Sequence, residues 1–400
     1  MMLLCNATAI TWQPARVEST DLRIRGDTIV ERGPRLTPRG EQVVDLDGRV
    51  VIPGMVCAHT HLYSALARGM PPPAAPPRDF REILEKVWWR LDRALDLDMV
   101  EASALAGAID AVSCGTTTIF DHHASPCAIE GSLGRLRRGI EPAGIRAVLC
   151  YEVTDRGGPE GARLGLEEHR RFAPDARFRL AVGAHASFTL EAATIDAIAG
   201  LARELDTGVH VHVAEDPVDA SPIGRLRPVL GPRTILAHGT HLTPDEVREA
   251  GDCWFVHNPR SNMNNAVGYA RHLPAKTALG TDGIGADMFA EARFAFFKAR
   301  DERATPRVLE MLQAGQDLAS AYFGRPFGTL APGSVADLAV LDYDPPTPLA
   351  ADNLAGHLVF GMDSRHVSRV MVGGRFVTRE SGERMASARE HARALWKKLE

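Results

Sequence analysis

The feature that most constrains the fold is a long alternation of strand-like and helix-like segments. Eight short apolar runs follow one another between Val50 and Gly280, and most of them are separated by stretches with helical spacing. They cover Val50–Val56, Thr116–Phe120, Arg146–Val153, Arg179–Gly183, Val209–Val213, Thr234–Ala237, Cys253–His257 and Ala278–Gly280. Alternation of this kind over roughly 260 residues is what a (β/α)8 TIM-type barrel requires. A doubly wound open sheet is the alternative, but no glycine-rich phosphate-binding motif follows the first strand.

The two ends of the chain have a different pattern. Residues 1–49 alternate between short strands and turns, and residues 328–378 return to strands with turns at Pro332-Gly333 and Gly373-Gly374. The predicted fold class is therefore α/β, with a small β-sandwich module built from residues 1–52 and 323–380. The barrel, residues 53–322, is inserted between these two segments. We expect residues 381–400 to form a solvent-exposed C-terminal helix.

Composition narrows the class of partner. The chain has 400 residues, of which 45% are hydrophobic, and a net charge of -5, so it can bury a large core. Its charges are interspersed and its apolar runs are too short to span a membrane, which argues against nucleic-acid and membrane partners. Met1–Trp12 lacks the basic start and apolar core of a signal peptide, and the six cysteines include no C-x-x-C pair. We therefore expect a cytoplasmic protein.

Polar residues at the predicted strand ends form a candidate site. His59 and His61 are two residues apart at the end of the first strand, so their imidazoles project to the same side. Functional residues of such barrels gather at the C-terminal ends of strands. Together with His212 and Asp282, the two histidines could surround one divalent ion and leave a position for water. Other polar residues at strand ends are His185, Glu215, His238, Asn258 and Asn262.

Each of these residues also has a simpler interpretation. Histidine pairs arise by chance in many chains, Asp282 alone could lie on a surface loop, and Glu215 alone could be a solvent-exposed glutamate. His122, His123, His210 and His241 have the alternative of a packed core histidine. Residues Asp79–Asp96 have helical spacing, and two adjacent tryptophans cannot both face one core. We expect Trp88 to pack and Trp89 to lie over the mouth of the site.

Several motifs resemble those of one enzyme superfamily. The segments VIPGMVCAHTHLYSALARG, VHVAED, ILAHGTHL, VHNPRSNMNNAVG and LGTDG resemble the successive strand-end motifs of the amidohydrolase superfamily. They are similar to the branch that contains cytosine deaminase, guanine deaminase and atrazine chlorohydrolase. GTLAPGSVADLAVLD resembles the sheet-module signature of these enzymes, and WWRLDRALD and DHHASP further resemble the SsnA-type aminohydrolases. The resemblance implies a (β/α)8 barrel, a bound zinc or iron ion and hydrolysis of a C–N or C–Cl bond.

The resemblance also implies roles for individual residues. His59, His61, His212 and Asp282 match the metal ligands, Glu215 matches a proton-shuttling glutamate, and His238 matches a histidine that contacts the attacking water. Asp282 and His238 would take up the proton of this water. Binuclear members carry a carboxylated lysine after the fourth strand. Here Gly183-Ala184-His185 occupies that position, so we expect one divalent ion, zinc or iron.

The predicted function is hydrolytic deamination of a nitrogen heterocycle such as a purine, pyrimidine, pterin or triazine. Ring-opening hydrolysis of a cyclic amide or imidazolone, and dechlorination, are the alternatives within the enzyme class. A catalytically idle binding barrel is the alternative outside it, but none of the proposed ligands or Glu215 has been lost. We expect a homodimer, with the loop Pro71–Pro77 and the two tryptophans as the apolar patch. The expected substrate-binding residues are His185, Trp89, His122, His123, Glu152, Asp155 and Asn262.

Overall fold

The chain passes from one part of the molecule to the other at Pro53 and Gly54. The structure, a computed structural model, describes residues 1–377 and 382–400. Strand β5 (Val50–Pro53) pairs with strands from the chain ends, whereas β6 (Met55–Thr60) pairs with the central strand β7 (Thr116–His123). A Cβ atom on Gly54 would lie 2.3 Å from the side chain of Thr117, so the backbones approach closely here. The predicted first strand is thus two strands in different sheets.

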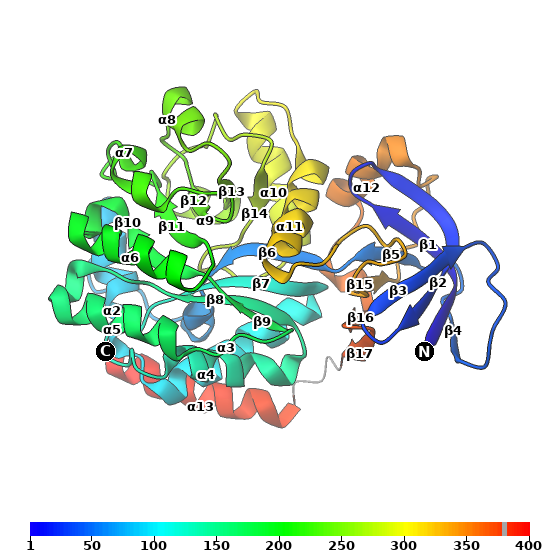
Figure 1. The fold of residues 1–400 in the computed structure, drawn as a ribbon, viewed down its shortest axis with the longest axis horizontal. Coiled ribbons are helices and arrows are strands. Elements are labelled where there is room, and N and C mark those ends of the chain that lie inside the picture. The colour runs from blue at the N-terminus through cyan, green and yellow to red at the C-terminus, as the bar shows by residue number, and fades with distance from the viewer. Residues whose placement is uncertain (378–381) are drawn as a thin grey trace.

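The terminal segments form one sheet, drawn at the right of Figure 1. Its strand order is β17-β16-β15-β5-β1-β2-β3, and β4 pairs with β1. Because β5 pairs with both β1 and β15, strands from the two chain ends share this sheet. The sandwich form of the module stays a prediction. The strands not yet bounded are β1 (Met2–Thr11), β2 (Arg16–Arg25), β3 (Thr28–Gly33), β4 (Gln42–Asp45), β15 (Leu338–Leu341), β16 (Val367–Val372) and β17 (Arg375–Val377).

The central region contains two parallel sheets that meet within one predicted strand. The first has the order β6-β7-β8-β9 and the second the order β10-β11-β12-β13-β14. Only Ala181 separates β9 (Phe178–Leu180), which pairs with β8, from β10 (Val182–Ala186), which pairs with β11. At the opposite edges, Thr60 and Asp282 form a parallel bridge. The other strands are β8 (Arg146–Tyr151), β11 (Val209–Val213), β12 (Ile235–His238), β13 (Trp254–His257) and β14 (Thr277–Leu279).

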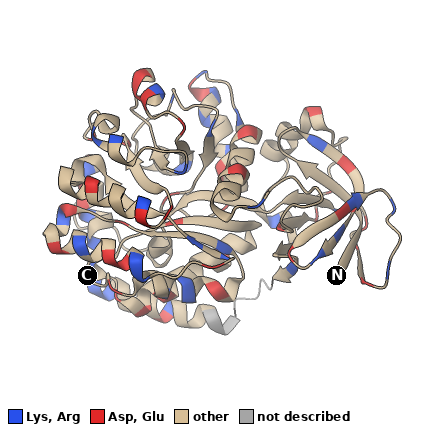
Figure 2. Ribbon diagram, in the orientation of Figure 1, with Lys and Arg blue, Asp and Glu red and all other residues tan. Residues whose placement is uncertain are grey.

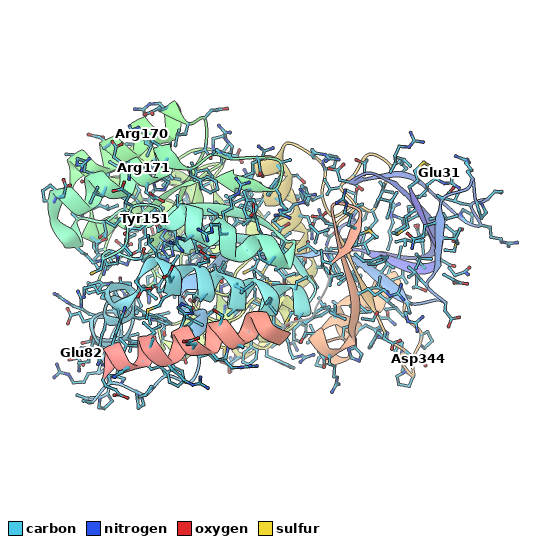
Figure 3. All side chains as sticks on the ribbon, turned by 90° about the horizontal axis from the view of Figure 1, so that it is seen from below. Glu31, Glu82, Tyr151, Arg170, Arg171 and Asp344 are labelled. Carbon is cyan, nitrogen blue, oxygen red and sulfur yellow. The ribbon has the colours of Figure 1, made fainter. Side chains whose placement is uncertain are left out.

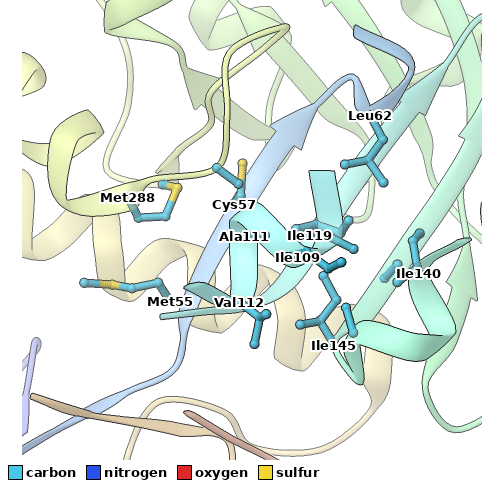
Figure 4. Packing of buried hydrophobic residues seen from close by; sticks show 14 of the residues in the cluster. Met55, Cys57, Leu62, Ile109, Ala111, Val112, Ile119, Ile140, Ile145 and Met288 are labelled. Carbon is cyan, nitrogen blue, oxygen red and sulfur yellow. The ribbon is translucent and has the colours of Figure 1, made fainter. Parts of the chain in front are cut away.

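Helices cover the central sheets, with α3 as the longest of those next to β7. Apolar residues of α3, among them Ile109 and Val112, pack with Met55 and Ile119 from the first sheet (Figure 4). The α-helices of this region are α3 (Leu97–Ser113), α4 (Ser132–Ile140), α5 (Gly158–Arg171), α6 (Ala192–Glu204), α7 (Pro222–Leu226), α8 (Pro244–Glu249), α9 (Pro259–Asn264), α10 (Met288–Asp301) and α11 (Val308–Phe323). Helix α12 (Leu354–Phe360) lies between β15 and β16 in the chain and beside the terminal sheet in Figure 1. Short helical turns are η1 (Leu62–Ala67), η3 (Glu141–Ala143), η4 (Asp155–Gly157), η5 (Ser187–Thr189), η6 (Arg227–Val229), η7 (Ala351–Asn353) and η8 (Ser364–His366).

The C-terminal helix α13 (Gly382–Leu399) lies along the central region rather than in solvent (Figure 1). Ala388 and Leu395 are buried, and the indole N–H of Trp396 donates to the backbone oxygen of Leu66 at 2.8 Å. The expected exposure therefore holds for the outer face of the helix, whereas the face that carries apolar residues at i and i+7 is packed. The predicted boundary between the terminal module and the last helix, at residues 380 and 381, lies outside the described residues.

The surface carries both signs of charge over both parts of the molecule (Figure 2). This agrees with the interspersed charges of the sequence and its small net charge. Across residues 1–377 and 382–400, none of the helices combines the length and the apolar character that crossing a membrane requires.

The segment that was predicted as one helix over Asp79–Asp96 is broken by a π-helical turn. Helix α1 (Phe80–Ile83) continues into the π-helix η2 (Leu84–Trp88) and then into α2 (Trp89–Ala94). A π-helical turn is wider than an α-helical one and shifts the positions of the residues that follow it. Trp88 and Trp89 both pack against the small cluster around Phe80 and Leu84. Trp88 packs against the main core cluster as well, which agrees with the expectation that this residue packs.

One buried histidine joins the two parallel sheets. His169, near the end of α5, is fully buried, and its Nε2 accepts hydrogen bonds from the backbone N–H of Tyr151 in β8 and of Gly183 in β10. Its Nδ1–H donates to the backbone oxygen of Gly165 at 2.7 Å. Figure 3 labels Tyr151 together with Arg170 and Arg171, which follow His169 in the chain. Burial lowers the pKa of His169 to about 4, so the imidazole is neutral and can accept both bonds.

We predict that His169 makes the fold sensitive to acid. Its folded pKa of about 4 lies below the unfolded value of 6.5. Its contribution to stability is therefore complete above pH 6.5 and is lost as the pH falls toward 4, up to about 3 kcal/mol. His169→Gln should lower the free energy of unfolding at pH 8 by about 1–3 kcal/mol, because two buried N–H groups lose their acceptor.

Urea unfolding at pH 8 and pH 4.5 measures both effects. The His169→Gln protein should lose less stability between these pH values than the wild type. His241→Gln, at an exposed position, is the matched control and should follow the wild type. Equal acid sensitivity of the wild type and His169→Gln would show that another group titrates.

Candidate metal and substrate site

Four polar side chains converge where strands from both sheets end. His59 and His61 come from the end of β6, His212 from β11, and Asp282 follows β14. Asp282 Oδ1 lies 2.9 Å from His61 Nε2 and 3.6 Å from His59 Nε2, and His61 Nε2 lies 3.2 Å from His212 Nε2. One donor atom from each residue lies within 4.8 Å of all the others. The structure thus brings together all four residues that the sequence predicted as ligands.

Each of the three imidazoles is held through its other ring nitrogen. His61 Nδ1 donates to the backbone oxygen of His122 at 2.5 Å, and His212 Nδ1 donates to that of His185 at 2.8 Å. A carbonyl can only accept, so each of these two rings carries a proton on Nδ1 and directs its Nε2 at the cluster. His59 Nδ1 lies 2.9 Å from Nε2 of His210. His210 is therefore a buried core histidine, as expected, and it also orients a candidate ligand.

The backbone at these strand ends adopts unusual conformations. Ala214, His238 and Asp282 have φ angles of 44°, 74° and 53°, a region that residues other than glycine seldom occupy. Ser261 Oγ donates to Asp282 Oδ2, which leaves Oδ1 directed at the histidines. Such conformations persist where the surroundings hold them, and they concentrate at functional sites.

Burial and the Asp282 carboxylate shift the pKa values of the neighbouring histidines in opposite directions. Burial lowers the pKa of His59 to about 3. Burial acts in the same direction on His61, but the adjacent Asp282 outweighs it and raises the pKa of His61 to about 9. Although burial opposes it, contact with His59 and His61 holds the pKa of Asp282 well below its usual value. The cluster therefore combines an ionised carboxylate with a proton on His61, which a divalent ion would displace because a ligating imidazole is neutral.

Glu215 and His238 lie beside this cluster. Glu215 Oε2 is 3.5 Å from His238 Nε2, and donor atoms of Glu215, His238 and Asp282 lie within 4.8 Å of one another. Burial raises the pKa of Glu215 to about 7, so its carboxyl can exchange a proton near neutral pH. Asn262 Oδ1 accepts from His238 Nδ1 at 2.8 Å, which directs Nε2 of His238 toward Glu215.

A cavity opens onto these groups. Its wall includes His61, His212, Glu215 and Asp282 together with the predicted substrate residues Trp89, Glu152 and His185. Trp89 thus lies at the cavity as expected, and Trp88, which packs against the core, lines the cavity as well.

Several predicted substrate residues lie behind this wall. His122 is fully buried, with Nε2 bonded to the backbone oxygens of Ala184 and His210. Asn262 contacts His238 rather than the cavity, and the residue that lines the wall is Asn265, one helical turn later. His123 Nε2 bonds to Ser125, and the Asp155 carboxylate accepts from the backbone N–H of Glu191. A direct substrate contact from these residues has no support in the structure.

The sequence reasoning missed Asp92, which is 1% exposed and lines the cavity. A signal was present, because Asp92 follows Trp88 by four residues and precedes Leu95 by three on a helical segment. A charged residue at a position with apolar neighbours at helical spacing is a candidate for a buried functional group. Ser261 and Asn265 gave no comparable signal.

A family model described as Amidohydrolase family matches residues 50–377. The chain belongs to the amidohydrolase family. It is 30% identical over 390 residues to a 5'-deoxyadenosine deaminase of Methanothermobacter thermautotrophicus, covering 89% of this chain and 88% of that protein. The structure resembles an adenosine deaminase from Xanthomonas campestris with bound zinc, with a TM-score of 0.84 at 22% identity over 98% of both chains. It also resembles an atrazine chlorohydrolase from Arthrobacter aurescens complexed with zinc, with a TM-score of 0.81 at 20% identity, covering 98% of this chain and 100% of that chain.

The amidohydrolase family assignment confirms the resemblance drawn from the strand-end motifs. The predicted class, a hydrolase of carbon–nitrogen bonds other than peptide bonds, is confirmed as well, because curated family relatives of this chain are deaminases. The two solved structures show that the fold is shared nearly end to end.

Proposed function

We propose that this amidohydrolase removes an exocyclic amino group from a nitrogen heterocycle, and that adenosine-type nucleosides are the first substrates to test. The observation that carries the proposal is the position of Glu215. Its carboxyl lines the cavity beside the four candidate ligands without belonging to that set, so it is free to move protons. Deaminase relatives at about this chain's full length support the same reaction.

We infer that the two parallel sheets close into one (β/α)8 barrel. At one edge, β9 of the first sheet and β10 of the second sheet follow each other in the chain with only Ala181 between them. At the other edge, backbone hydrogen bonds join the end of β6 to the segment after β14. Thr281 N and Asp282 N donate to the oxygen of His59 at 2.8 and 3.1 Å. Residues 53–322 would form this barrel, residues 1–52 and 323–380 the terminal module, and residues 381–400 the last helix.

His59, His61, His212 and Asp282 would hold one divalent ion, with zinc as the first choice and iron as the alternative. Their donor set fits such an ion. His59 Nε2 is buried and has no hydrogen-bond partner among the described residues, an arrangement that costs free energy unless a ligand binds there. Three imidazoles and one carboxylate are ligands that zinc accepts. When bound, the ion makes a water molecule nucleophilic at neutral pH.

The surroundings favour one ion over two. Donor atoms of Glu152, His61 and His122 also lie within 4.8 Å of one another, so a second site is conceivable there. However, Glu152 Oε1 already accepts from Arg156 Nη2 at 3.0 Å. A guanidinium at this distance repels a second cation and occupies one of the ligand oxygens.

The proposed roles follow from the positions of the side chains. Asp282 and His238 lie where they can accept the proton that the attacking water loses. Glu215, with its raised pKa, protonates the ring nitrogen and then the departing amine. Asn262 fixes the orientation of His238, and the aromatic rings of the cavity wall exclude water from the heterocycle. Ring opening uses the same groups but retains the nitrogen, so released ammonia distinguishes the two reactions.

The homodimer and the cytoplasmic location stay predictions. The expected dimer patch included Trp88 and Trp89, but both side chains line the cavity, so this patch does not support a dimer. Light scattering of the purified protein measures the oligomeric state directly.

The proposed ligand set predicts the metal content of variants. His59→Ala, His61→Ala, His212→Ala and Asp282→Ala should each strip or greatly weaken binding of a single ion, because a four-ligand site seldom survives the loss of one. Plasma mass spectrometry of the purified proteins should find about one ion per wild-type chain. His241→Ala, outside the cluster, is the control and should retain the ion. Two ions per wild-type chain would contradict the single-ion proposal.

The proposed role of Glu215 predicts a separation of activity from metal binding. Glu215→Gln conserves volume and removes no ligand, so the ion and the melting temperature should be retained. Ammonia release should nevertheless fall by about 10²–10⁴-fold, because the amide cannot carry the proton. Glu160→Gln, at an exposed position on α5, should leave the rate unchanged. A Glu215→Gln enzyme with bound ion and near-normal turnover would assign the proton transfer to another residue.

A further inference from the structure

Arg156 lies behind the cavity wall, where two buried carboxylates share it. Its Nη2 lies 3.3 Å from Asp92 Oδ2 and 3.0 Å from Glu152 Oε1, and both acids line the cavity. The guanidinium also stacks on Trp89, with 4.5 Å between its carbon and the ring centroid. Two negative charges are therefore shared by one positive charge, and the group keeps a net charge of about -1 at neutral pH.

Asp92 retains an acceptor atom that the protein does not use. Asp92 Oδ1 is buried and has no hydrogen-bond partner within the described part of the chain. Because the residue is 1% exposed and lines the cavity, its carboxylate is a buried negative charge at the cavity wall. Leaving an acceptor atom of such a group unpaired costs free energy.

The rest of the cavity wall has the same sign of charge. Asp219 accepts from Ser187 Oγ and from the backbone N–H of Ala214, both neutral donors. Asp216 accepts from the backbone N–H of Val218 at 3.0 Å and is partly exposed. Among the described residues that line the cavity there are six carboxylates and no lysine or arginine; the acids are Asp92, Glu152, Glu215, Asp216, Asp219 and Asp282. A divalent ion would offset Asp282 and Glu215, and Arg156 offsets one charge of Asp92 and Glu152, so the cavity wall keeps a negative net charge.

We propose that this site selects its substrate by charge: it takes heterocycles whose substituent is cationic or a neutral hydrogen-bond donor, and it rejects those with an anionic substituent. The inference rests on the proposed function and adds the class of substrate to it. An anion in this cavity would meet several carboxylates, and the Arg156 guanidinium is already paired with two of them. Juxtaposed like charges in a partly buried site lower affinity strongly.

Three nucleosides with the same ring and different 5' substituents test the proposal. They are 5'-deoxyadenosine, 5'-amino-5'-deoxyadenosine and adenosine 5'-monophosphate, assayed with the metal-loaded enzyme at pH 8. Burial raises the pKa of Asp92 to about 6, so it is ionised at this pH. We expect kcat/KM for the phosphate to be at least about 10-fold below that of the other two, and the deficit to shrink as salt screens the charges.

Charge-neutral variants separate charge from size. Asp216→Asn and Asp92→Asn conserve shape, so each should raise the phosphate's kcat/KM relative to that of 5'-deoxyadenosine. Rejection by size alone would leave this ratio unchanged. Asp206→Asn is the control, because this aspartate is 92% exposed and lies outside the cavity. Equal turnover of all three nucleosides, or a ratio that neither cavity variant changes, would overturn the proposal.

A binding measurement keeps the test independent of turnover. If none of the nucleosides releases ammonia, the choice of adenosine-type substrates fails, but the charge selection can still be measured. Benzyltrimethylammonium and benzenesulfonate have similar size and opposite charge, and Trp88 and Trp89 report binding through their fluorescence. The cation should bind at least about 10-fold more tightly, and Asp216→Asn should reduce this preference. Equal or tighter binding of the sulfonate would overturn the proposal.

Discussion

Four polar side chains converge on one small volume, and within the described part of the chain the buried His59 Nε2 among them has no hydrogen-bond partner. His59, His61, His212 and Asp282 come from three segments far apart in the sequence, yet their donor atoms lie within 4.8 Å of one another. Burial keeps His59 neutral while Asp282 attracts a proton to His61, so the cluster contains strongly unequal pKa values within one small volume. A divalent ion would satisfy all four groups at once.

The surrounding structure fixes this cluster through a layer of hydrogen bonds. Backbone oxygens of His122 and His185 hold two of the imidazoles, and His210 holds the third. His122 itself bonds to the backbone of β11 and of β10, so the ligand-orienting carbonyl belongs to a residue that is also fixed. Because small displacements weaken metal sites, such contacts contribute to the chemistry although they do not touch the substrate.

Much of the site could be predicted from the sequence because its residues lie in short motifs at strand ends. His59 and His61 share one side of a strand, and Glu215 follows His212 by three residues, so local spacing alone places them near one another. Residues whose roles depend on tertiary packing could not be found this way. His169 joins two sheets through backbone groups of Tyr151 and Gly183, and nothing in its neighbouring residues indicates those partners.

The largest errors came from irregular helix geometry. The π-helical turn Leu84–Trp88 interrupts the segment that was predicted as one helix, and both tryptophans line the cavity. Asn262 and Asn265 lie one turn apart on and just after α9, and only the structure shows that the first contacts His238 and the second lines the cavity. Spacing places residues on a face of a helix, but the orientation of that helix decides which residue meets the substrate.

The most direct test of the central claim is anomalous X-ray diffraction from crystals of the zinc-loaded protein, with data collected on both sides of the zinc absorption edge. The account predicts one anomalous peak per chain, within bonding distance of His59 Nε2, His61 Nε2, His212 Nε2 and an oxygen of Asp282. The Glu215 carboxyl should lie outside bonding distance and face the same open position. A second peak beside Glu152 and His122, or a single peak that Glu215 ligates, would contradict the account.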